Sequence, residues 1–592
     1  MTVNMNGRLL RALLVGGFFS LAVSGVLLSS PVRAGGPLFV NGTTPIRWPR
    51  TLTQGGALNS QTVDASGTVL YRVDSGPLGT LSNAEATALV DRIFGLYSNI
   101  PTSSIRFANA GRILDPDTRQ AIDVTSTNFG KISSTVRPTF QNPIVFDSDG
   151  SITGGGGVLG FFGPLQIDAV NNFQVEGFVV LNGAFVSRIG RIPFLGVFTH
   201  EFGHFAGPLD HSQINGNIAA SSSSAVLPPG YSPAQIFDLY TPYTETVYPF
   251  IFNAPAGSQL SSFGNSGAFI ASLDMDTKNA LSNLYPAPGY RAVDPGSPNG
   301  AIEGRVVIRT SSGDIPVNGI DVVARRISRG AYPPPPGATA FPNNQVSVDS
   351  DGVPLPPPDR DVTDSLAMAS SAVTGVEFGS GAYRIDGLQP GNYMVQVVQI
   401  NPNATGGSGI GPLDVQFPLI VKEQSIGSVA VAAGVVTSGT DFVLAGFSNA
   451  ALVTVNEREP NEKAAKAQSL MFPAEVLGSG SDADAAKLKI IFPGDAGVGP
   501  LHDLYTFTLT APKTIFVALD PVSGSGDMDL YIFSDAFPGK KIPLTDSSVM
   551  AFSASEKASE QIAVQLGPGQ YYIGVSIFDG SFNYRLRVVQ SQ

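Results

Sequence analysis

The sequence predicts a multidomain protein in which a mixed α/β domain precedes two strand-rich modules. A chain of 592 residues is too long for one hydrophobic core and is expected to divide into several domains. Only 14% of the residues are charged, whereas 67 are glycine and 45 are proline. Such a composition is typical of strands joined by many turns. From about residue 298 onward, helical spacing of apolar residues gives way to short alternating segments.

Residues 1–34 have the pattern of a signal peptide. Arg8 and Arg11 precede an apolar run over 12–28, and a small-residue site ends at Ala34. This order of a basic region, an apolar region and a small-residue site predicts cleavage by a signal peptidase. A membrane anchor is the alternative, although the apolar run is slightly short for one. We therefore expect a secreted or cell-envelope protein with no membrane contact after cleavage.

The net charge and the absence of cysteine restrict the partners of the chain. A formal net charge of −12 provides no basic excess to neutralise phosphates, so nucleic acid is not an expected partner. The chain contains no cysteine, which excludes disulfides, zinc ribbons and thiol nucleophiles. Any metal ion must therefore be held by histidines and carboxylates.

The first domain is expected to span residues 37–292 and to alternate strands with helices. Apolar residues alternate from Val69 as in a strand, and Ser82 with Glu85 forms a capping-box pattern at a helix start. Pro193 is a favourable first-turn residue for a second long helix. The predicted elements are a strand at 69–73, a helix at 82–98, a strand at 104–107, a glycine-rich loop at 154–157, a strand at 179–183, and helices at 193–204 and 274–285.

The two modules that follow are expected at residues 298–448 and 457–592. A proline-rich segment, 332–361, interrupts the first module and is expected to form a solvent-facing loop. Runs of β-branched and aromatic residues bounded by turn residues predict the strands. These strands lie at 302–308, 319–325 and 383–398 in the first module, and at 504–509, 514–519, 528–533 and 571–577 in the second.

The residues that indicate chemistry are concentrated at 198–213, which read FTHEFGHFAGPLDHSQ. His200 and His204 are four residues apart, so on a helix both imidazoles project from one face and can share an ion. Glu201 lies one residue further round, where its carboxylate can reach a metal-bound water without ligating the metal. Zinc lowers the pKa of that water, and the glutamate accepts its proton as it attacks an amide carbonyl. A helix with two surface histidines is the alternative.

A third ligand is expected just beyond this helix. Gly207 is expected to let the chain leave the helix in a conformation that other residues resist. The turn can then bring either Asp210 or His211 back to the same ion, because zinc accepts both carboxylate oxygen and imidazole nitrogen. Three of the four histidines in the chain lie within residues 200–211. This concentration favours a metal site over a chance pattern.

These residues resemble the signature of a known family. The run His-Glu-Phe-Gly-His at 200–204, the following Gly207 and the run Leu-Asp-His-Ser at 209–212 are similar to the zinc signature of matrixins. Matrixins are the matrix-metalloproteinase-like branch of the metzincins. The resemblance extends over residues 37–292 and includes the closing helix at 274–285.

The resemblance implies a two-lobed α/β, metzincin-like catalytic domain that hydrolyses peptide bonds within proteins. It implies zinc (Zn2+) as the metal, His200, His204 and His211 as its ligands, and Glu201 as the general base. Protein or peptide substrates are the partners that this activity requires. Family members often silence the zinc with a propeptide cysteine, which this chain lacks, so any latency must work otherwise.

The sequence departs from the family pattern at the third ligand. Pro208 is inserted, so Asp210 stands at the expected count after Gly207 and His211 stands one residue later. A bulge at Gly207 and Pro208 would restore His211 as the ligand. Asp210 remains the alternative third ligand.

A second departure concerns the methionine-containing turn that matrixins have beneath the zinc. The best match is the run Val247, Tyr248 and Pro249, in which Val247 stands in place of methionine. This turn packs below the site and need not ligate the metal, so an apolar substitute is tolerable. A different peptidase family, with glutamate as third ligand, would require Glu245, which lacks a recognisable helical context.

Two acidic turns are candidates for calcium (Ca2+). Asp147 and Asp149 belong to the turn at 147–150, and a similar pattern occurs at 349–352. Calcium loops place carboxylates beside a turn glycine in this way. Neither run continues into a twelve-residue loop with a terminal glutamate, so a plain acidic turn is the alternative.

The two later modules resemble known companions of secreted enzymes. Residues 301–306 and 383–393 are similar to a carboxypeptidase regulatory-like domain. Runs similar to bacterial pre-peptidase C-terminal domains occur at 459–461, 503–507, 529–531 and 567–572. Both resemblances imply β-sandwiches, and the second is typical of exported peptidases. The sequence as a whole therefore predicts a secreted zinc endopeptidase. The alternative is a secreted binding or surface protein whose peptidase domain is catalytically impaired.

Overall fold

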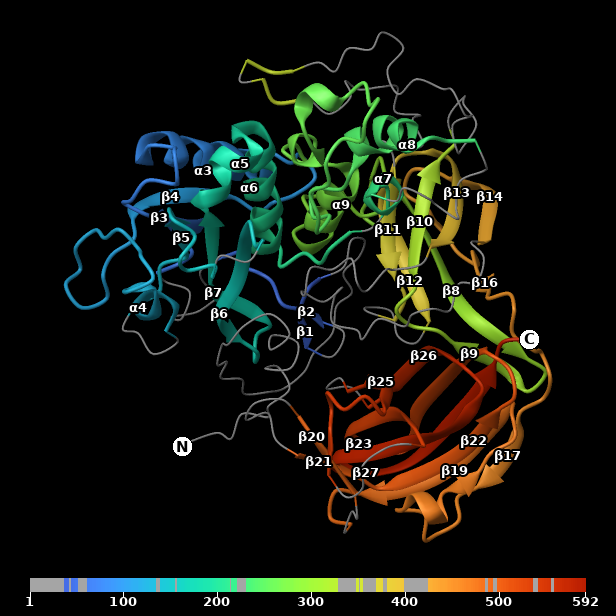
Figure 1. Cartoon of the computed structure of the whole chain (residues 1–592). Helices are drawn as coiled ribbons and strands as arrows, with labels where there is room; N and C mark the ends of the chain where they lie inside the picture. The colour runs from blue at the N-terminus through green and yellow to red at the C-terminus, as the bar shows by residue number, and fades with distance from the viewer. Residues whose placement is uncertain are drawn as a thin grey trace.

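The computed structural model describes residues 37–592 apart from 42–43, 52–60, 135–138, 155–156, 213, 221–229, 328–347, 351, 355–368, 376–380, 399–423, 485–487, 493–497, 536–540 and 555–557. The predicted signal peptide and most of the proline-rich segment therefore lie outside the described residues. The described part of the chain is multidomain and strand-rich, with its sheets in three successive groups (Figure 1). None of its helices is long and apolar enough to cross a membrane.

The first domain is built on a five-stranded sheet in the order β4-β3-β5-β7-β6. The strands are β3 (Val69–Val73), β4 (Phe107–Arg112), β5 (Pro143–Asp147), β6 (Gly160–Asp168) and β7 (Phe173–Asn182). The first four strands in this order pair in parallel, whereas β6 pairs antiparallel with β7. Within the described residues, β6 is an edge strand of this sheet.

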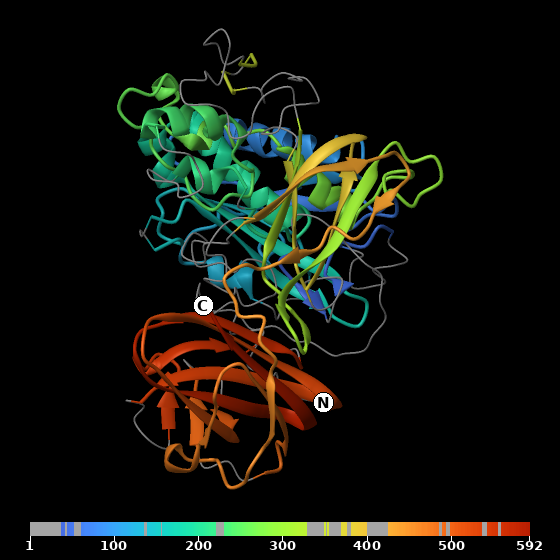
Figure 2. The same ribbon diagram turned by 90° about the vertical axis from the view of Figure 1, so that its right-hand side faces the viewer.

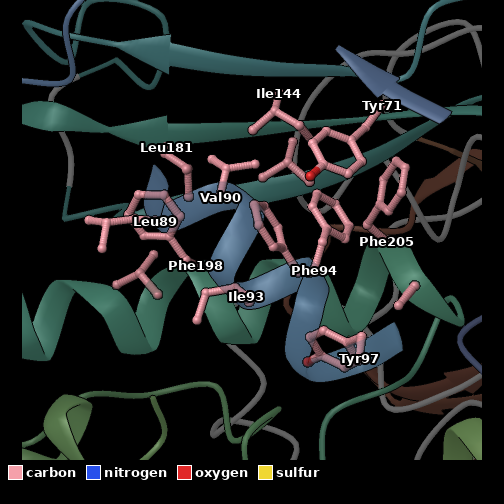
Figure 3. Packing of buried hydrophobic residues seen from close by; sticks show 14 of the residues in the cluster. Tyr71, Leu89, Val90, Ile93, Phe94, Tyr97, Ile144, Leu181, Phe198 and Phe205 are labelled. Carbon is pink, nitrogen blue, oxygen red and sulfur yellow. The ribbon is translucent and has the colours of Figure 1, made fainter. Parts of the chain in front are cut away.

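Two long helices, α3 (Asn83–Ser98) and α6 (Arg191–Ala206), pack against this sheet. Figure 3 shows their apolar side chains meeting those of the strands. The ring of Phe94 on α3 lies between two other buried rings, with centroid distances of 4.1 Å to Tyr71 and 4.2 Å to Phe202. Full burial of each such ring contributes about 1.5–3 kcal/mol. The ring stack therefore fixes α6 relative to both α3 and the sheet.

The remaining α-helices of the first domain are shorter than α3 and α6. They are α4 (Phe129–Ser133), α5 (Val186–Ile189), α7 (Gly216–Ala220), α8 (Pro233–Tyr240) and α9 (Met275–Leu284). A short two-stranded sheet, β1 (Val40–Asn41) with β2 (Thr44–Pro45), precedes them.

The helix starts in this domain confirm the capping pattern read from the sequence. The side chain of Ser82 accepts from the backbone N–H of Glu85, and the Glu85 carboxylate accepts from Ser82 in return. Helix α9 begins after Asp274, whose side chain accepts from the N–H of Thr277. Each cap satisfies backbone donors that the first turn of a helix leaves unpaired.

The strand predicted at 104–107 is wrong in its position. Ser104 N–H donates to the carbonyl of Tyr285, which holds this segment against the end of α9, and β4 begins only at Phe107. Strand β5 was not among the predicted elements. All five of its residues are buried, so it lacks the alternation on which strand prediction depends.

The second domain consists of two sheets that share one core. One sheet has the order β11-β10-β13-β14 and the other β12-β8-β15, with β9 and β16 also paired to β8. Val322 of the first sheet and Ile302 of the second belong to the same buried cluster. The strands are β8 (Gly300–Thr310), β9 (Gly313–Pro316), β10 (Asp321–Arg326), β11 (Ala369–Val373), β12 (Ala382–Leu388), β13 (Gly391–Val398), β14 (Gln424–Val431), β15 (Val436–Thr437) and β16 (Phe442–Val443).

The third domain contains a large sheet and a three-stranded sheet, and lies at one end of the molecule in both views (Figures 1 and 2). The two runs predicted at 514–519 and 528–533 belong to one long strand, β23, which pairs with the equally long β27. The strands are β17 (Val453–Asn456), β18 (Gln468–Ser469), β19 (Ala474–Ser481), β20 (Leu488–Ile491), β21 (Val498–Leu501), β22 (Asp503–Leu509), β23 (Lys513–Ser534), β24 (Lys541–Pro543), β25 (Val549–Ser553), β26 (Glu560–Leu566) and β27 (Gly569–Gln590).

The second and third domains share part of their cores. Phe516 on β23, Ala563 on β26 and Val589 on β27 are buried in the cluster that fills the second domain. Their chain neighbours on the same strands face the core of the third domain instead, as the alternation of side chains along a strand requires. Gln561 adds two hydrogen bonds across the contact, because it accepts from Asn318 N–H at 2.9 Å and donates to the carbonyl of Pro316 at 3.0 Å.

Candidate metal centre

Helix α6 carries two of the predicted ligands one turn apart. Almost every residue of α6 from Pro193 onward is buried, because the helix lies between the sheet and the rest of the first domain. Gly203 permits a close approach on the side away from the sheet. A Cβ atom added there would lie 2.6 Å from Cγ1 of Val247, so a larger residue would push this part of α6 away from the turn below it.

The imidazoles of three histidines converge at the end of α6. Nε2 of His204 lies 3.1 Å from Nε2 of His200 and 3.2 Å from Nε2 of His211. One ring nitrogen from each of the three lies within 4.8 Å of the others. His204 and His211 are buried, whereas His200 is partly exposed. The structure therefore brings together the three histidines that the sequence singles out.

Backbone carbonyls set the orientation of two of these rings. Nδ1 of His200 lies 3.2 Å from the carbonyl oxygen of Thr246, and Nδ1 of His204 lies 2.6 Å from that of Leu209. A carbonyl can only accept, so each Nδ1 carries the hydrogen and each Nε2 presents a lone pair. Sequence reasoning did not identify Thr246 and Leu209 as such partners, because a backbone carbonyl leaves no signature in the side chains.

The spacing of the Nε2 atoms fits a metal ion. Two lone pairs that face each other at 3.1 Å repel unless a cation lies between them. Zinc–nitrogen bonds of about 2.0–2.1 Å at tetrahedral angles separate the ligand nitrogens by about 3.3–3.4 Å. Three imidazoles with one open position is also a donor set found in catalytic zinc sites. The residues present therefore fit zinc.

Burial keeps the histidines in the form that binds metals. Desolvation, with a smaller contribution from the neighbouring His204, lowers the pKa of His200 to about 3. Desolvation lowers the pKa of His204 to about 4. Both rings are therefore neutral at pH 7, and neutral imidazole is the form that ligates a metal ion.

Glu201 directly follows His200 on α6, and its side chain approaches the edge strand β6. Its side chain is buried, and desolvation raises its pKa to about 8, opposed by a hydrogen bond from the backbone N–H of Phe162 on β6. A dication nearby would favour the charged form of this carboxylate. A Cβ atom added to Gly160 on β6 would lie 3.0 Å from Cγ of Glu201, which shows how closely β6 approaches this side chain.

The turn after α6 differs from the prediction for Gly207. Gly207 has φ −136° and ψ 19°, so it does not supply a conformation that other residues resist. Pro208 has φ of 20°, away from the value near −65° that its ring favours. A Cβ atom at this position would lie 2.8 Å from Cδ1 of Leu281 and 2.9 Å from Cδ2 of Leu209, so a larger residue would displace these buried side chains.

Asp210, the alternative third ligand, is not part of the histidine group. Its carboxyl group is buried, and its pKa is raised well above the usual value by desolvation and by the nearby carboxylates of Asp276 and Asp321. Glu245, which the other ligand arrangement would require, accepts hydrogen bonds from the backbone N–H groups of Asn215 and Gly216. Neither carboxylate therefore points to the three Nε2 atoms.

The segment 247–249, which was expected to match a methionine-containing turn, lies beside α6. Val247 is buried in the main core of the first domain and contacts Gly203. Tyr248 N–H donates to the carbonyl of Glu245, which closes a turn. The ring of Tyr248 packs on Gly216, and Pro249 follows this turn.

The predicted calcium residues occupy an ordinary hydrogen-bonded turn. Both carboxylate oxygens of Asp147 accept from the segment that follows, Oδ1 from Ile152 N–H and Oδ2 from Thr153 N–H. Asp149 accepts from the N–H of Ser151. In the other acidic turn, Asp351 lies outside the described residues. Calcium at either turn remains a prediction.

A second group of metal-compatible side chains lies in the third domain. Carboxylate oxygens of Glu457, Glu459 and Asp503 lie within 4.8 Å of one another. Oδ1 of the buried Asn461 has no hydrogen-bond partner next to them. Glu459, Asn461 and Asp503 lie in the runs 459–461 and 503–507, which resemble pre-peptidase C-terminal domains in sequence. Their grouping depends on strands that are distant in sequence, so no local spacing could have revealed it.

Comparisons with known proteins provide no family assignment. No family model matches the chain, and no curated protein matches it. The pre-peptidase C-terminal domain of a collagenase from Bacillus anthracis aligns at 17% identity and a TM-score of 0.16, over 22% of this chain and 99% of that chain. Two proteins described as carbohydrate binding also align. The one from Pseudomonas aeruginosa has 15% identity and a TM-score of 0.11, over 25% of this chain and 87% of its own. The one from Bacteroides uniformis has 10% identity and a TM-score of 0.14, over 50% of this chain and 99% of its own. These TM-scores are too low to assign a fold or an activity.

Proposed function

We propose that this chain is an exported zinc endopeptidase that hydrolyses peptide bonds with Glu201 as the general base. One observation carries the proposal, namely the convergence of three imidazole Nε2 atoms beside a buried carboxylate. Three imidazoles can hold a dication and leave a ligand position open. Export through the segment 1–34 and cleavage there belong to the same proposal.

The edge strand β6 supports a polypeptide as the substrate. Within the described residues, its outer edge is not paired in a sheet, and its backbone at Phe162 reaches the carboxylate of Glu201. An unpaired strand edge binds an extended peptide through main-chain hydrogen bonds. A peptide aligned on β6 would therefore pass with its backbone close to Glu201 and the three histidines.

The histidines and Glu201 have different roles in the proposed reaction. When bound, zinc supplies a Lewis acid that polarises a carbonyl group and lowers the pKa of water. The backbone carbonyls of Thr246 and Leu209 hold the rings of His200 and His204 in the tautomer that carries its hydrogen on Nδ1. The carboxylate of Glu201 accepts the proton of the attacking water and returns it to the leaving amine.

The proposal is tested with the Glu201→Gln variant, which keeps the size of the side chain and removes the base. We expect wild-type protein to cleave casein or gelatin, and 1,10-phenanthroline to abolish this cleavage. Glu201→Gln should retain zinc and lose at least about 100-fold in rate, which is typical of the loss of a general base. A matched control is Glu560→Gln, which changes a buried glutamate in the third domain and should cleave as the wild type does.

The possible outcomes separate the two functions predicted from the sequence. Equal rates for wild type and Glu201→Gln would remove Glu201 as the base. Stoichiometric zinc without hydrolysis of any substrate would favour the catalytically impaired binding protein. Absence of zinc uptake by the wild type would contradict both.

A further inference from the structure

The loop that carries His211, called the ligand loop below (residues 207–212 and 214–215), contacts a residue of the second domain. Nη1 of Arg325, on β10, donates to Oδ1 of Asn215 at 2.8 Å, and its Nε donates to Oε1 of Gln396 at 3.2 Å. Arg325 is 1% exposed and Asn215 is 2% exposed. A buried guanidinium requires partners for its charge and its donors. One of those partners here lies four residues after a proposed zinc ligand.

A second contact joins the two domains at the residue next to that ligand. Ser212 Oγ donates to Oδ2 of Asp276 at 2.7 Å. The backbone N–H of Ser371, on β11 of the second domain, donates to Oδ1 of the same carboxylate at 2.7 Å. Ser212 directly follows His211, so a strand of the second domain and the ligand loop share one buried carboxylate.

Asn215 also connects this loop to the segment that orients His200. Its backbone N–H donates to Oε1 of Glu245 at 2.6 Å. Glu245 directly precedes Thr246, whose carbonyl accepts from Nδ1 of His200. The contact of Arg325 with Asn215 therefore acts on the loop that carries His211 and, through Glu245, on the segment that orients His200.

The interface between the two domains also includes an apolar contact. Along β10, Val322 faces the core of the second domain, while Val323 packs on Ile214 of the ligand loop. Alternation places Arg325 on the same face as Val323. Ser371 pairs with Val323 across the two strands. The outer face of β10 therefore contacts the ligand loop at Val323 and Arg325, while β11 contacts α9 through Ser371 and Asp276.

We propose that the second domain is a component of the metal centre, and that Arg325 is a positioning residue for the loop that carries His211. The inference deepens the proposed function and rests on it. Arg325 acts through Asn215 and does not touch the metal. Removal of its donor leaves Oδ1 of Asn215 buried without that partner and allows the loop to move. His211 then spends less time in register with His200 and His204, and zinc is released faster.

The test measures zinc release from the full-length protein in excess chelator. We expect Arg325→Met to release zinc on the order of tenfold faster than wild type, the size of effect that residues supporting metal ligands have. Arg325→Lys keeps the positive charge and a hydrogen-bond donor group but loses the planar fork of the guanidinium, so its release rate should lie between those of wild type and Arg325→Met. The visible spectrum of the cobalt(II)-substituted protein reports the ligand geometry without any need for activity, and Arg325→Met should change it.

The second domain offers a matched control for this variant. Arg384 is 8% exposed and forms ion pairs with Asp386 and Glu303, which lie in its own domain. Arg384→Met therefore also removes a buried guanidinium from the second domain but leaves Asn215 untouched. It should lower the melting temperature without a change in the zinc release rate or in the cobalt spectrum.

The outcomes distinguish this inference from the proposed function. If wild type binds zinc and Arg325→Met releases it at the rate of Arg384→Met, the positioning role of Arg325 is overturned while the zinc site stands. If Arg325→Met does not fold, Arg325→Lys decides: faster release than wild type supports the role, and an equal rate overturns it. If wild type takes up no zinc, both the inference and the proposed function fall.

Discussion

The Nδ1–H group of His204 donates to the carbonyl of Leu209 at 2.6 Å, and Leu209 stands two residues before His211. One histidine of the group therefore holds the start of the loop that supplies another. The ring of His204 cannot turn without breaking a hydrogen bond to this loop. The three imidazoles are for this reason expected to act as one unit in metal binding.

Zinc content provides the first prediction. The purified protein should contain one zinc ion per chain by elemental analysis, and His204→Ala should lose it. At a free zinc concentration about 100 times the Kd, the wild type should gain about 2.7 kcal/mol in free energy of unfolding. His502 lies in the third domain, where Nδ1 accepts from Ile577 N–H, so His502→Ala should keep its zinc. Equal zinc content in the two variants would contradict the site.

The contact between Gly203 and Val247 provides the second prediction. Gly203→Ala places a Cβ atom 2.6 Å from Cγ1 of Val247 and 3.0 Å from the hydroxyl oxygen of Tyr97. Overpacking of this kind costs about 1–3 kcal/mol. Urea unfolding should show this loss, and Val247→Ala should restore part of it in the double variant because it removes the nearer methyl group. Independent, additive effects of the two substitutions would argue against a direct contact.

The ring of Phe94 provides the third prediction. It packs between Tyr71 and Phe202 in the core beneath α6. Phe94→Ala should reduce the free energy of unfolding of the first domain by about 3–5 kcal/mol. Phe552 is 43% exposed, and Phe552→Ala should change stability by about 0.5 kcal/mol or less. Thermal unfolding of the two variants under identical conditions provides the comparison.

The buried carboxyl group of Asp74 provides a prediction for the pH dependence of stability. Desolvation raises its pKa from 3.8 to about 6, against hydrogen bonds from the N–H groups of Gly76, Phe146 and Val124. Because the folded state holds the proton more tightly than the unfolded chain, this contribution is fully present below about pH 4. This stabilising contribution, on the order of 1–3 kcal/mol, is lost as the pH rises through 6.

The variant Asp74→Asn isolates this contribution from other buried carboxyl groups. The free energy of unfolding of the wild type minus that of Asp74→Asn should fall as the pH rises from 4 to 6. A flat difference would show that folding leaves the pKa of Asp74 unchanged, and a difference that rises with pH would show that the folded state favours its charged form.

Local patterns in the sequence were sufficient where the structure depends on near neighbours. The capping box of Ser82 and Glu85 was predicted because both partners lie within one turn. His200 and His204 were predicted to share a helix face because helical spacing alone places them there. Strand β5 escaped prediction because burial on both faces removes alternation.

Features that depend on distant segments did not follow from the sequence. The side-chain spacing left Asp210 and His211 both open as the third ligand, because the choice depends on the backbone of Gly207 and Pro208. Packing against Leu281, which lies on α9, determines why residue 207 is glycine. The contact of Arg325 with Asn215 joins residues 110 positions apart, and no periodicity or motif encodes such a pairing.

The contact between the second and third domains has a consequence for how the chain can be shortened. Phe516, Ala563 and Val589 complete a core that belongs mainly to the second domain. Proteolytic removal of residues 457–592 would expose apolar residues of that core to water. The exposed apolar surface would favour self-association. Domain dissection of this protein should therefore begin with cuts that keep the second and third domains together.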